Sequence, residues 1–221
     1  MKKFLLTFLL GFTIVLHFFL AAAEETTTRL EPVDESAKNA SFVKFKKELR
    51  DAILKKDSTF IKKVLSDNVE YSFGADPDRK SAIDGFLKHY NIEDKKDSDF
   101  WKNLLDAVDL GCTNSGEDFI CPYVYAKWPD KFDSFSFVVT TGEKIPIRKK
   151  PETAADILRF TNFEILKIVR EQKTDGWRAI DLGNKQVGYV AKSDVRSPIE
   201  YRAQFSKTSE GWKLKYFIAG D

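Results

Sequence analysis

The sequence predicts an α+β fold, in which a mainly helical N-terminal domain precedes a small β-barrel and a C-terminal β-hairpin. Three observations lead to this prediction. Apolar residues recur at helical spacing between Phe42 and Val108. From Phe135 onward, short alternating segments separated by turn residues are typical of strands. Two matched alternating segments end the chain, with Thr208-Ser209-Glu210-Gly211 as the turn between them.

The first 23 residues have the three parts of a secretory signal peptide. Met1-Lys2-Lys3 is followed by an apolar run from Phe4 to Leu20 and then by three alanines, ending at Ala23. The alternative is a retained N-terminal anchor, because the apolar run approaches the length that spans a bilayer. The Ala-x-Ala ending, followed at once by charged and Thr-rich sequence, favours cleavage after Ala23. We therefore expect residues 1–23 to be a signal peptide and the mature protein to be periplasmic or secreted.

Removal of the signal peptide changes the charge balance. The whole chain has 36 Lys and Arg against 34 Asp and Glu, and both charges of residues 1–23 are lysines, which leaves 34 against 34. A neutral mature protein argues against a nucleic-acid partner and against an anionic membrane surface, since both select for basic proteins. No second long apolar stretch follows Ala23, so we expect no transmembrane segment in the mature chain.

Histidine is too scarce for most hydrolytic sites. The chain has two His, and His17 would leave with the signal peptide, so only His89 remains. A Cys-His or Ser-His-Asp site would have to use His89, and a zinc site built on several imidazoles cannot form. The alternative for His89 is a place on a helix surface. We therefore expect no catalytic residue, no metal and no cofactor, and a protein that is not an enzyme.

Cys112 and Cys121 flank a short loop of polar residues and glycine. In an exported protein, two cysteines this close predict a disulfide that closes the loop. The alternative is a free nucleophilic cysteine, but such a residue needs an activating base, and none lies nearby in the sequence. Closing so short a loop should contribute about 2–3 kcal/mol on the chain-entropy model.

Residues 24–40 and 41–130 differ in pattern. The first are polar, charged and Thr-rich, with Pro32 and no apolar period, which is typical of a flexible leader. The second are predicted to form a helix-rich α+β domain, in which an alternating segment from Val69 to Phe73 predicts a strand. The helical faces are marked by apolar residues that include Phe42, Leu49, Ile61, Phe86 and Leu104. We expect the boundary with the next domain between Trp128 and Phe135.

Residues 135–197 carry a series of segments that can be compared with a known family. The segments are Ile145-Pro146-Ile147-Arg148-Lys149-Lys150-Pro151, Ile157 to Thr161, Glu164 to Val169, Gly176-Trp177-Arg178-Ala179-Ile180 and Gln186-Val187-Gly188-Tyr189-Val190. Together they resemble the bacterial SH3 domain family, whose pattern is V-x-V-R-x-x-P, an apolar pair before a turn, G-W-x-x-V and G-x-x-G-[WY]-V. The resemblance covers roughly a quarter of the chain and implies a small SH3-like β-barrel.

The resemblance also implies a kind of partner. Bacterial SH3 domains are usually found outside the cytoplasm and often bind cell-wall peptides or glycans, so such a ligand or an envelope protein is the expected partner. Arg148, Phe160, Trp177 and Tyr189 occupy the family's basic and aromatic positions and are the candidate ligand-binding residues. Each has a structural alternative: the aromatic residues can serve packing, and Arg148 can pair with a carboxylate.

Residues 198–221 are predicted to form a β-hairpin, because Ile199, Tyr201, Ala203 and Phe205 alternate before the turn and similar residues alternate after it. The hairpin either extends the barrel or returns to the helical domain, which would make the barrel an insertion. The whole chain also resembles exported bacterial proteins that contain an SH3 domain and end in a similar Trp-containing hairpin. That resemblance implies no activity.

Three functions are compatible with these features. We expect a cell-envelope binding or scaffolding protein with the SH3-like module as its contact, because of the signal, the module and the scarcity of histidine. A second is a small-ligand carrier, whose pocket between the helical domain and the hairpin would be lined by residues such as Phe73, Trp101 and Tyr216.

The third function is a glycan hydrolase that uses carboxylates alone, since two acids suffice for that reaction. Acidic residues are abundant, and no pair stands out among them. Examples are Glu48, Glu70, Asp76 and Asp84.

Overall fold

The computed structural model describes residues 27–74, 81–93 and 97–220, so the predicted signal peptide lies outside the described residues. The helices are α1 (Ala40–Lys55), α2 (Ser58–Val64), α3 (Ala82–His89), α4 (Asp99–Asp109), α5 (Tyr123–Ala126) and the 3₁₀ turns η1 (Ser36–Lys38) and η2 (Lys192–Asp194). The first strands are β1 (Leu65–Glu70), β2 (Thr113–Ser115), β3 (Asp118–Cys121), β4 (Phe137–Thr140), β5 (Ile145–Arg148) and β6 (Ile157–Thr161). The remaining strands are β7 (Ile165–Thr174), β8 (Trp177–Asp181), β9 (Val187–Ala191), β10 (Val195–Arg196), β11 (Arg202–Thr208) and β12 (Gly211–Ile218).

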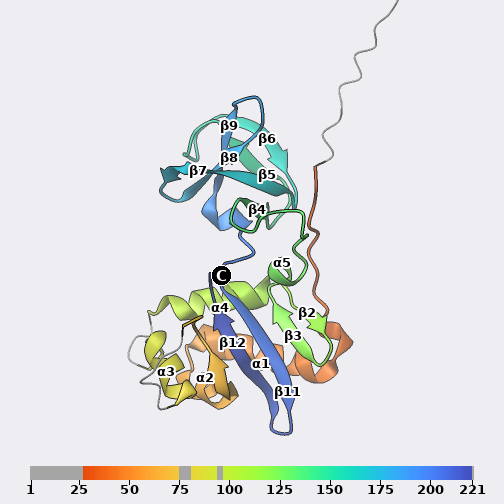
Figure 1. Cartoon of the computed structure of the whole chain (residues 1–221), viewed down its shortest axis with the longest axis vertical. Coiled ribbons are helices and arrows are strands. Elements are labelled where there is room, and N and C mark those ends of the chain that lie inside the picture. The colour runs from red at the N-terminus through yellow and green to blue at the C-terminus, as the bar shows by residue number, and fades with distance from the viewer. Residues whose placement is uncertain (1–26, 75–80, 94–96, 221) are drawn as a thin grey trace, which may run out of the picture.

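These elements form two sheets, which confirms the mixed helix and strand composition that the sequence predicts. One has five strands in the order β1-β12-β11-β3-β2, and the other has seven in the order β10-β4-β7-β8-β9-β5-β6. We call residues 36–126 with 198–220 the helical lobe and residues 135–197 the sheet lobe. They are the lower and upper halves of Figure 1. No helix within the described residues is long and apolar enough to cross a membrane.

Local hydrogen bonds explain where the helices begin. The Asn39 side chain accepts from the backbone N–H groups of Ser41 and Phe42 at 3.1 and 3.2 Å and caps α1. Asp57 caps α2 by accepting from the N–H of Phe60 at 3.0 Å. Such caps satisfy backbone donors that a first helical turn leaves unpaired.

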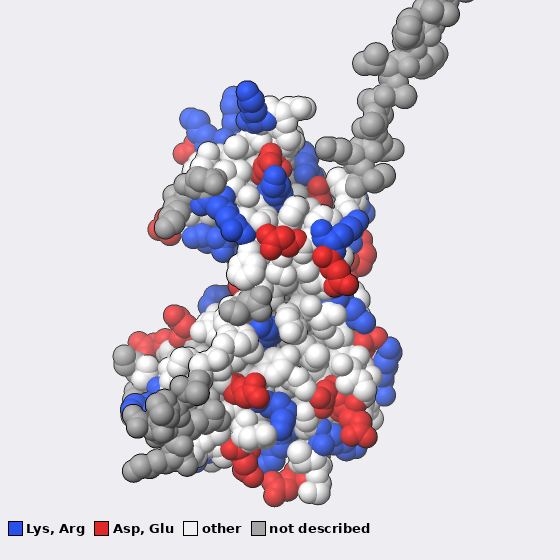
Figure 2. Space-filling model, in the orientation of Figure 1, with Lys and Arg blue, Asp and Glu red and all other residues white. Residues whose placement is uncertain are grey.

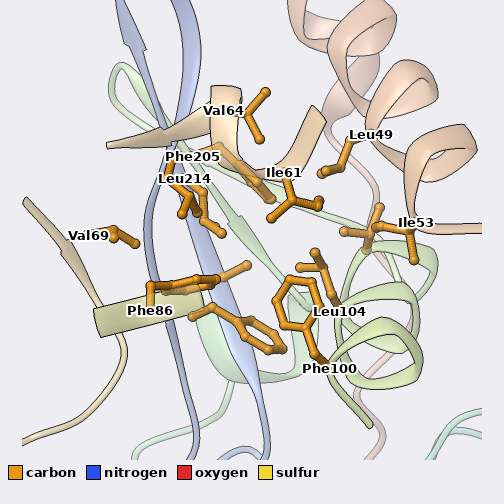
Figure 3. Close-up of a cluster of buried hydrophobic side chains, with 14 of the residues drawn as sticks. Leu49, Ile53, Ile61, Val64, Val69, Phe86, Phe100, Leu104, Phe205 and Leu214 are labelled. Atoms are coloured by element: carbon orange, nitrogen blue, oxygen red, sulfur yellow. The ribbon is translucent and has the colours of Figure 1, made fainter. Parts of the chain in front are cut away.

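The core of the helical lobe lies between the helices and one face of the five-stranded sheet. In Figure 3, side chains from α1 and α4 and from the hairpin strands β11 and β12 point into the same space. Phe42 of α1 stacks on Phe119 of β3, with ring centroids 3.8 Å apart. Large side chains fill this region with almost no exposure, among them Phe42, Leu49, Ile61, Phe86, Leu104, Phe205 and Leu214.

The C-terminal hairpin belongs to the helical lobe. Strand β11 pairs with β3 in antiparallel fashion, and β12 pairs with β1 in parallel fashion. Trp212 of β12 anchors the hairpin to α1, because its Nε1 donates to the Ser41 hydroxyl at 3.1 Å. Of the two placements that the sequence allows, the hairpin therefore takes the return to the helical lobe, and the sheet lobe lies between its two halves in the sequence.

The sheet lobe is a single antiparallel sheet. Its buried face carries Val138, Ile147, Leu166, Ile180, Val190 and Val195. Gly188 permits close packing there, because a Cβ at this position would come within 2.4 Å of Ile147 and 2.9 Å of Leu182. Within the described strands, the edges β10 and β6 do not pair with each other, so the sheet is not closed into a barrel.

The two lobes meet at a separate apolar cluster, which we call the junction cluster. Its buried members are Leu30, Tyr123, Val124, Val139 and Ile165. Backbone hydrogen bonds join Leu30 N–H to the Phe163 carbonyl at 2.8 Å and Ile165 N–H to the Thr28 carbonyl at 2.9 Å. Burial raises the pKa of Tyr123 to about 12, so this side chain stays neutral in the cluster.

The described part of the leader thus differs from the flexible segment that its composition predicts. Residues 27–39 run along both lobes, and Leu30 is only 8% exposed. The leader has too few apolar residues to show a period. One leucine between two lobes and a few backbone hydrogen bonds are enough to hold it, and neither signal is visible in composition.

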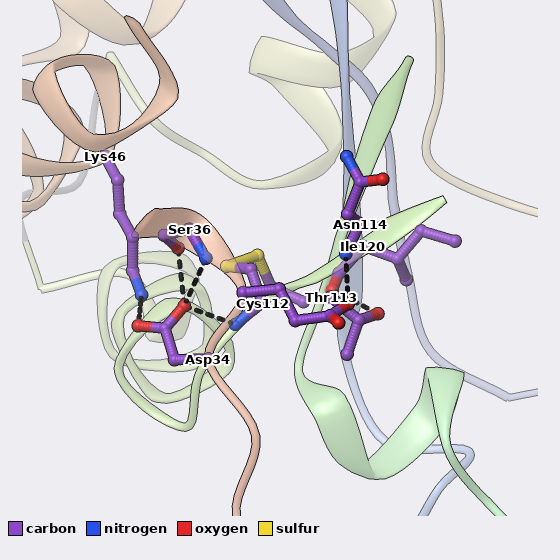
Figure 4. Close-up of a disulfide and its surroundings, with 9 residues drawn as sticks. Asp34, Ser36, Lys46, Cys112, Thr113, Asn114 and Ile120 are labelled. Atoms are coloured by element: carbon purple, nitrogen blue, oxygen red, sulfur yellow. Dashed lines mark hydrogen bonds and ion pairs between the residues drawn. A yellow bond between two sulfur atoms is a disulfide. The ribbon is translucent and has the colours of Figure 1, made fainter. Parts of the chain in front are cut away.

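The predicted disulfide between Cys112 and Cys121 is present and confirms that interpretation. Figure 4 shows it beside Asp34, which ties the leader to the helical lobe. The Asp34 carboxylate accepts from Lys46 Nζ at 2.7 Å and from the backbone N–H groups of Ser36 and Cys112 at 3.1 and 3.3 Å. The backbone N–H of Glu35 donates to the Cys112 carbonyl at 2.7 Å. The disulfide hairpin and the leader are therefore held together.

We expect Leu30→Ala to lower the free energy of unfolding by about 2–4 kcal/mol, because it removes a buried leucine from a packed cluster. Leu54→Ala is the matched control, since Leu54 on α1 is 54% exposed and its truncation should change stability by less than about 0.5 kcal/mol. Urea unfolding followed by circular dichroism measures both. Equal effects of the two changes would show that the leader does not pack as described.

We also expect Asp34 to contribute stability that depends on pH. Burial opposes its ionisation, but hydrogen bonds from Lys46 and Ser36 outweigh that effect and lower its pKa from 3.8 to about 2. A carboxyl with a lower pKa in the folded state stabilises the fold above its unfolded pKa and loses that contribution as the pH falls through the folded value. Asp34→Asn should therefore lose less stability than the wild type between about pH 4 and about pH 2. Parallel curves of stability against pH would contradict this.

Candidate ligand-binding face

Strand register brings the candidate ligand-binding residues to one face of the sheet lobe. Arg148 of β5 lies opposite Tyr189 of β9, so their side chains share a face. Pro146, two residues before Arg148, lies opposite Phe160 of β6. Because residues two apart on a strand point the same way, Phe160 is on this face too. Ile147, between them in β5, points to the core and is fully buried.

Trp177 joins the same face from β8. It lies opposite Ala191, while Ala179 lies opposite Tyr189. Both pairs are two residues apart on their strands, so Trp177 and Tyr189 point the same way. We call the surface formed by Arg148, Phe160, Trp177 and Tyr189 the aromatic face.

A side-chain contact spans the middle of the aromatic face. The Tyr189 hydroxyl donates to Gln172 Oε1 at 2.8 Å. Gln172 is in β7, and β8 lies between β7 and β9, so the two side chains reach across β8. Ala179 of β8 is only 2% exposed although it points outward, which agrees with a position beneath this contact. Tyr189 is thereby held in one orientation.

The surface next to Trp177 is hollowed to a volume of about 480 Å³. Trp177 and Ile168 supply apolar walls, and Gln172 and Thr174 supply neutral polar groups. The charged lining residues are the cations Arg170, Arg178 and Lys192 and the single acid Asp175. An aromatic wall with an excess of cations suits a ligand that has both an apolar group and a carboxylate.

The other two candidates differ in exposure. Arg148 is half-buried, and its Nη1 donates to the Ala155 carbonyl at 2.9 Å. Among the described residues, its partner is therefore a backbone carbonyl and not the carboxylate that the sequence allows as an alternative. Phe160 is 58% exposed. Ile157, which lies opposite Arg148 in the neighbouring strand, is 43% exposed. This end of the face is apolar and open to solvent.

Charge is unequally divided along the chain. Residues 135–197 contain 12 Lys and Arg against 8 Asp and Glu, a net charge of +4. If residues 1–23 are removed, the rest of the chain has 22 Lys and Arg against 26 Asp and Glu, a net charge of −4. Figure 2 shows basic side chains along the edges of the sheet lobe, above a constriction between the lobes. The sheet lobe is therefore basic, although residues 24–221 taken together have no net charge.

The residues weighed for hydrolysis come from separate elements. His89, at the end of α3, is exposed and lies against Tyr90, with ring centroids 4.6 Å apart. Glu48 on α1, Glu70 on β1 and Asp84 on α3 are exposed, and Asp76 lies outside the described residues. Across residues 27–74, 81–93 and 97–220, no group of three or more His, Cys, Asp or Glu side chains could hold a metal ion.

The residues named for a carrier pocket also lie apart. Trp101 is buried in the core of the helical lobe, in contact with Phe100 at a ring distance of 5.2 Å. Phe73 is 59% exposed. Its ring lies over the guanidinium of Arg202, with 5.5 Å between the ring centroid and Cζ of the arginine. Tyr216 lies opposite Gln204 in the hairpin. Aromatic rings fill the space between the helices and the sheet, where the sequence suggested a cavity.

Several residues of the hollow beside Trp177 are missing from the sequence-based candidates. No sequence motif includes Gln172, Arg170 or Lys192. A polar residue in an alternating strand indicates only a solvent-facing position. The contact of Gln172 with Tyr189 depends on strand order, which the alternation does not define.

Comparison with models of protein families, with curated proteins and with solved structures finds no match to this chain.

Proposed function

We propose that this protein is an exported cell-envelope protein that binds a peptide or glycan of the cell wall through the aromatic face of an SH3-like sheet lobe. The observation that supports this most directly is the hollow beside Trp177, where an aromatic wall meets three cations and one acid. The SH3-like motifs of residues 145–190 run through the strands that build this face. Export agrees with the signal-like N-terminal sequence and with a disulfide, which persists in oxidising compartments.

The chemistry of the face suits the cell wall. Wall peptides carry free carboxylates, which the excess of cations in the hollow and the net charge of the sheet lobe would attract. Sugar rings and aliphatic side chains present apolar surfaces, which half-exposed aromatic rings contact well. Tyr189 is already oriented by Gln172, so little side-chain freedom would be lost on binding.

We expect the mature protein to co-sediment with purified peptidoglycan sacculi. Trp177→Ala should raise the apparent Kd by at least about tenfold, since truncating a central aromatic in an interface costs about 2 kcal/mol or more. Phe160→Ala should weaken binding less, because Phe160 is more exposed. Phe73→Ala is the matched control: Phe73 and Phe160 are 59% and 58% exposed, but Phe73 is in the helical lobe. Circular dichroism must first show that all variants fold.

A charge-reversal pair tests the same site without truncating an aromatic side chain. Lys192→Glu changes an exposed cation that lines the hollow, whereas Lys207→Glu makes the same change on β11 of the helical lobe. We expect only Lys192→Glu to weaken sedimentation, and this effect should shrink as salt is raised. Absence of wild-type binding would reject a wall ligand. Equal loss in both members of either pair would reject the aromatic face as its site.

A further inference from the structure

A second pocket lies on the face of the five-stranded sheet opposite the core of the helical lobe. Its volume is about 670 Å³. Strands β2 and β3, helix α5 and the two connections between the lobes supply its lining. Apolar walls come from Trp128, Phe132 and Ile199, and the pocket also contains Lys127 and Arg202 against one acid, Asp130.

Arg202 is the unusual residue of this pocket. It is only 4% exposed, and it forms no ion pair with any residue in the described part of the chain. Its Nη1 donates to the Gly220 carbonyl at 2.8 Å, and its Nε is buried without a hydrogen-bond partner. The rings of Tyr125 and Phe73 lie 4.6 and 5.5 Å from its Cζ.

Among the described residues, 27–74, 81–93 and 97–220, the contacts of Arg202 compensate its buried charge only in part. A guanidinium has five N–H donors, and a buried charge is costly unless it is paired and hydrogen-bonded. Two aromatic rings and one carbonyl offset part of that cost. A carboxylate would accept from two of the remaining donors at once, and it is the group that fits a guanidinium best.

Tyr125 lies between α5 and this cation, with its ring centroid 4.6 Å from Cζ of Arg202. It belongs to α5, a single turn of four residues, and is 38% exposed. Nearby Trp128 is held by a hydrogen bond from its Nε1 to the Phe132 carbonyl at 2.9 Å, so the apolar wall keeps its position.

We propose that this pocket binds a carboxylate that adjoins an apolar group, with Arg202 as the residue that recognises the carboxylate. The ligand is either a small free acid or the C-terminal end of a peptide, since both present this chemistry. The site is separate from the aromatic face, and its proposal does not depend on binding to the cell wall.

The test uses N-acetyl-L-phenylalanine and, as the neutral counterpart, its C-terminal amide. The mature protein is titrated with each while the Nε–H signals of arginine are followed by NMR. We expect the acid to bind with a Kd of about 1 mM or tighter and to shift the Arg202 Nε–H signal, and the amide to bind at least tenfold more weakly. An acetylated tetrapeptide ending in phenylalanine distinguishes the sources: tighter binding than the acid indicates a peptide end, and weaker binding indicates a free acid.

Two variants keep the proposal open to refutation. Arg202→Gln should abolish binding, but it can also unfold the hairpin, because Arg202 holds Gly220. Ala126→Asp places a negative charge on an exposed lining residue and should weaken binding of the acid at least tenfold, while Ala126→Asn should leave it unchanged. The proposal is wrong if the acid and its amide bind equally, if neither binds, or if Ala126→Asp binds like wild type. Sedimentation with sacculi should be unaffected by either Ala126 variant, so the two proposed sites can fail independently.

Discussion

The position of the two lobes, and with it the pocket at Arg202, depends on the contacts that Leu30 makes between them. This side chain is buried among Tyr123 and Val124 of the helical lobe and Val139 and Ile165 of the sheet lobe. The N–H of Leu30 donates to the carbonyl of Phe163, just before β7, and the carbonyl of Thr28 accepts from the N–H of Ile165, the first residue of β7. Domains joined only by linkers are expected to move relative to one another. The junction cluster replaces that freedom with a packed contact, so the pocket at Arg202, which includes both connections, has defined walls.

The order of the chain adds a second constraint. The sheet lobe is made after α5 and before β11, yet β11 and β12 are central strands of the five-stranded sheet. Phe205 and Leu214, from those strands, are almost completely buried in the core of the helical lobe. That core therefore cannot close until the last strands have formed, and such non-local pairing slows folding. The disulfide hairpin is joined to the leader through Asp34, and its strand β3 is the one with which β11 pairs.

The sequence predicts well the features that depend on residues close together in the chain. The helices are found because apolar residues recur on one side of each, and the disulfide is found because its partners are close in the chain. Partners that are distant in the sequence are not found. The alternation of β11 indicates which side chains face the core, but not that the strand pairs with β3. Arg202 was not found for the same reason: in an alternating strand it indicates a solvent-facing position, whereas its neighbours Phe73, Tyr125 and Gly220 come from three other parts of the chain. The barrel expected from the motifs is an open seven-stranded sheet, since the motifs specify strands and turns but not the pairing of the edges.

The two candidate sites present positive charge in opposite ways. The hollow beside Trp177 is lined by cations on a lobe with a net charge of +4, and exposed charges act over a distance of about 10 Å that shrinks with salt. Such charges raise the rate of encounter with an anionic polymer more than they add to its final affinity. Arg202 is buried in the helical lobe, which has 19 Lys and Arg against 18 Asp and Glu and so a net charge of only +1; it therefore attracts little from afar but interacts strongly with a group that reaches it. Exposed cations with half-buried aromatic rings suit a large, repetitive ligand bound at the surface. A single buried guanidinium beside a tyrosine suits one carboxylate of one small ligand. Because the two kinds of cation lie in different lobes, the two proposed ligands would not compete for the same surface.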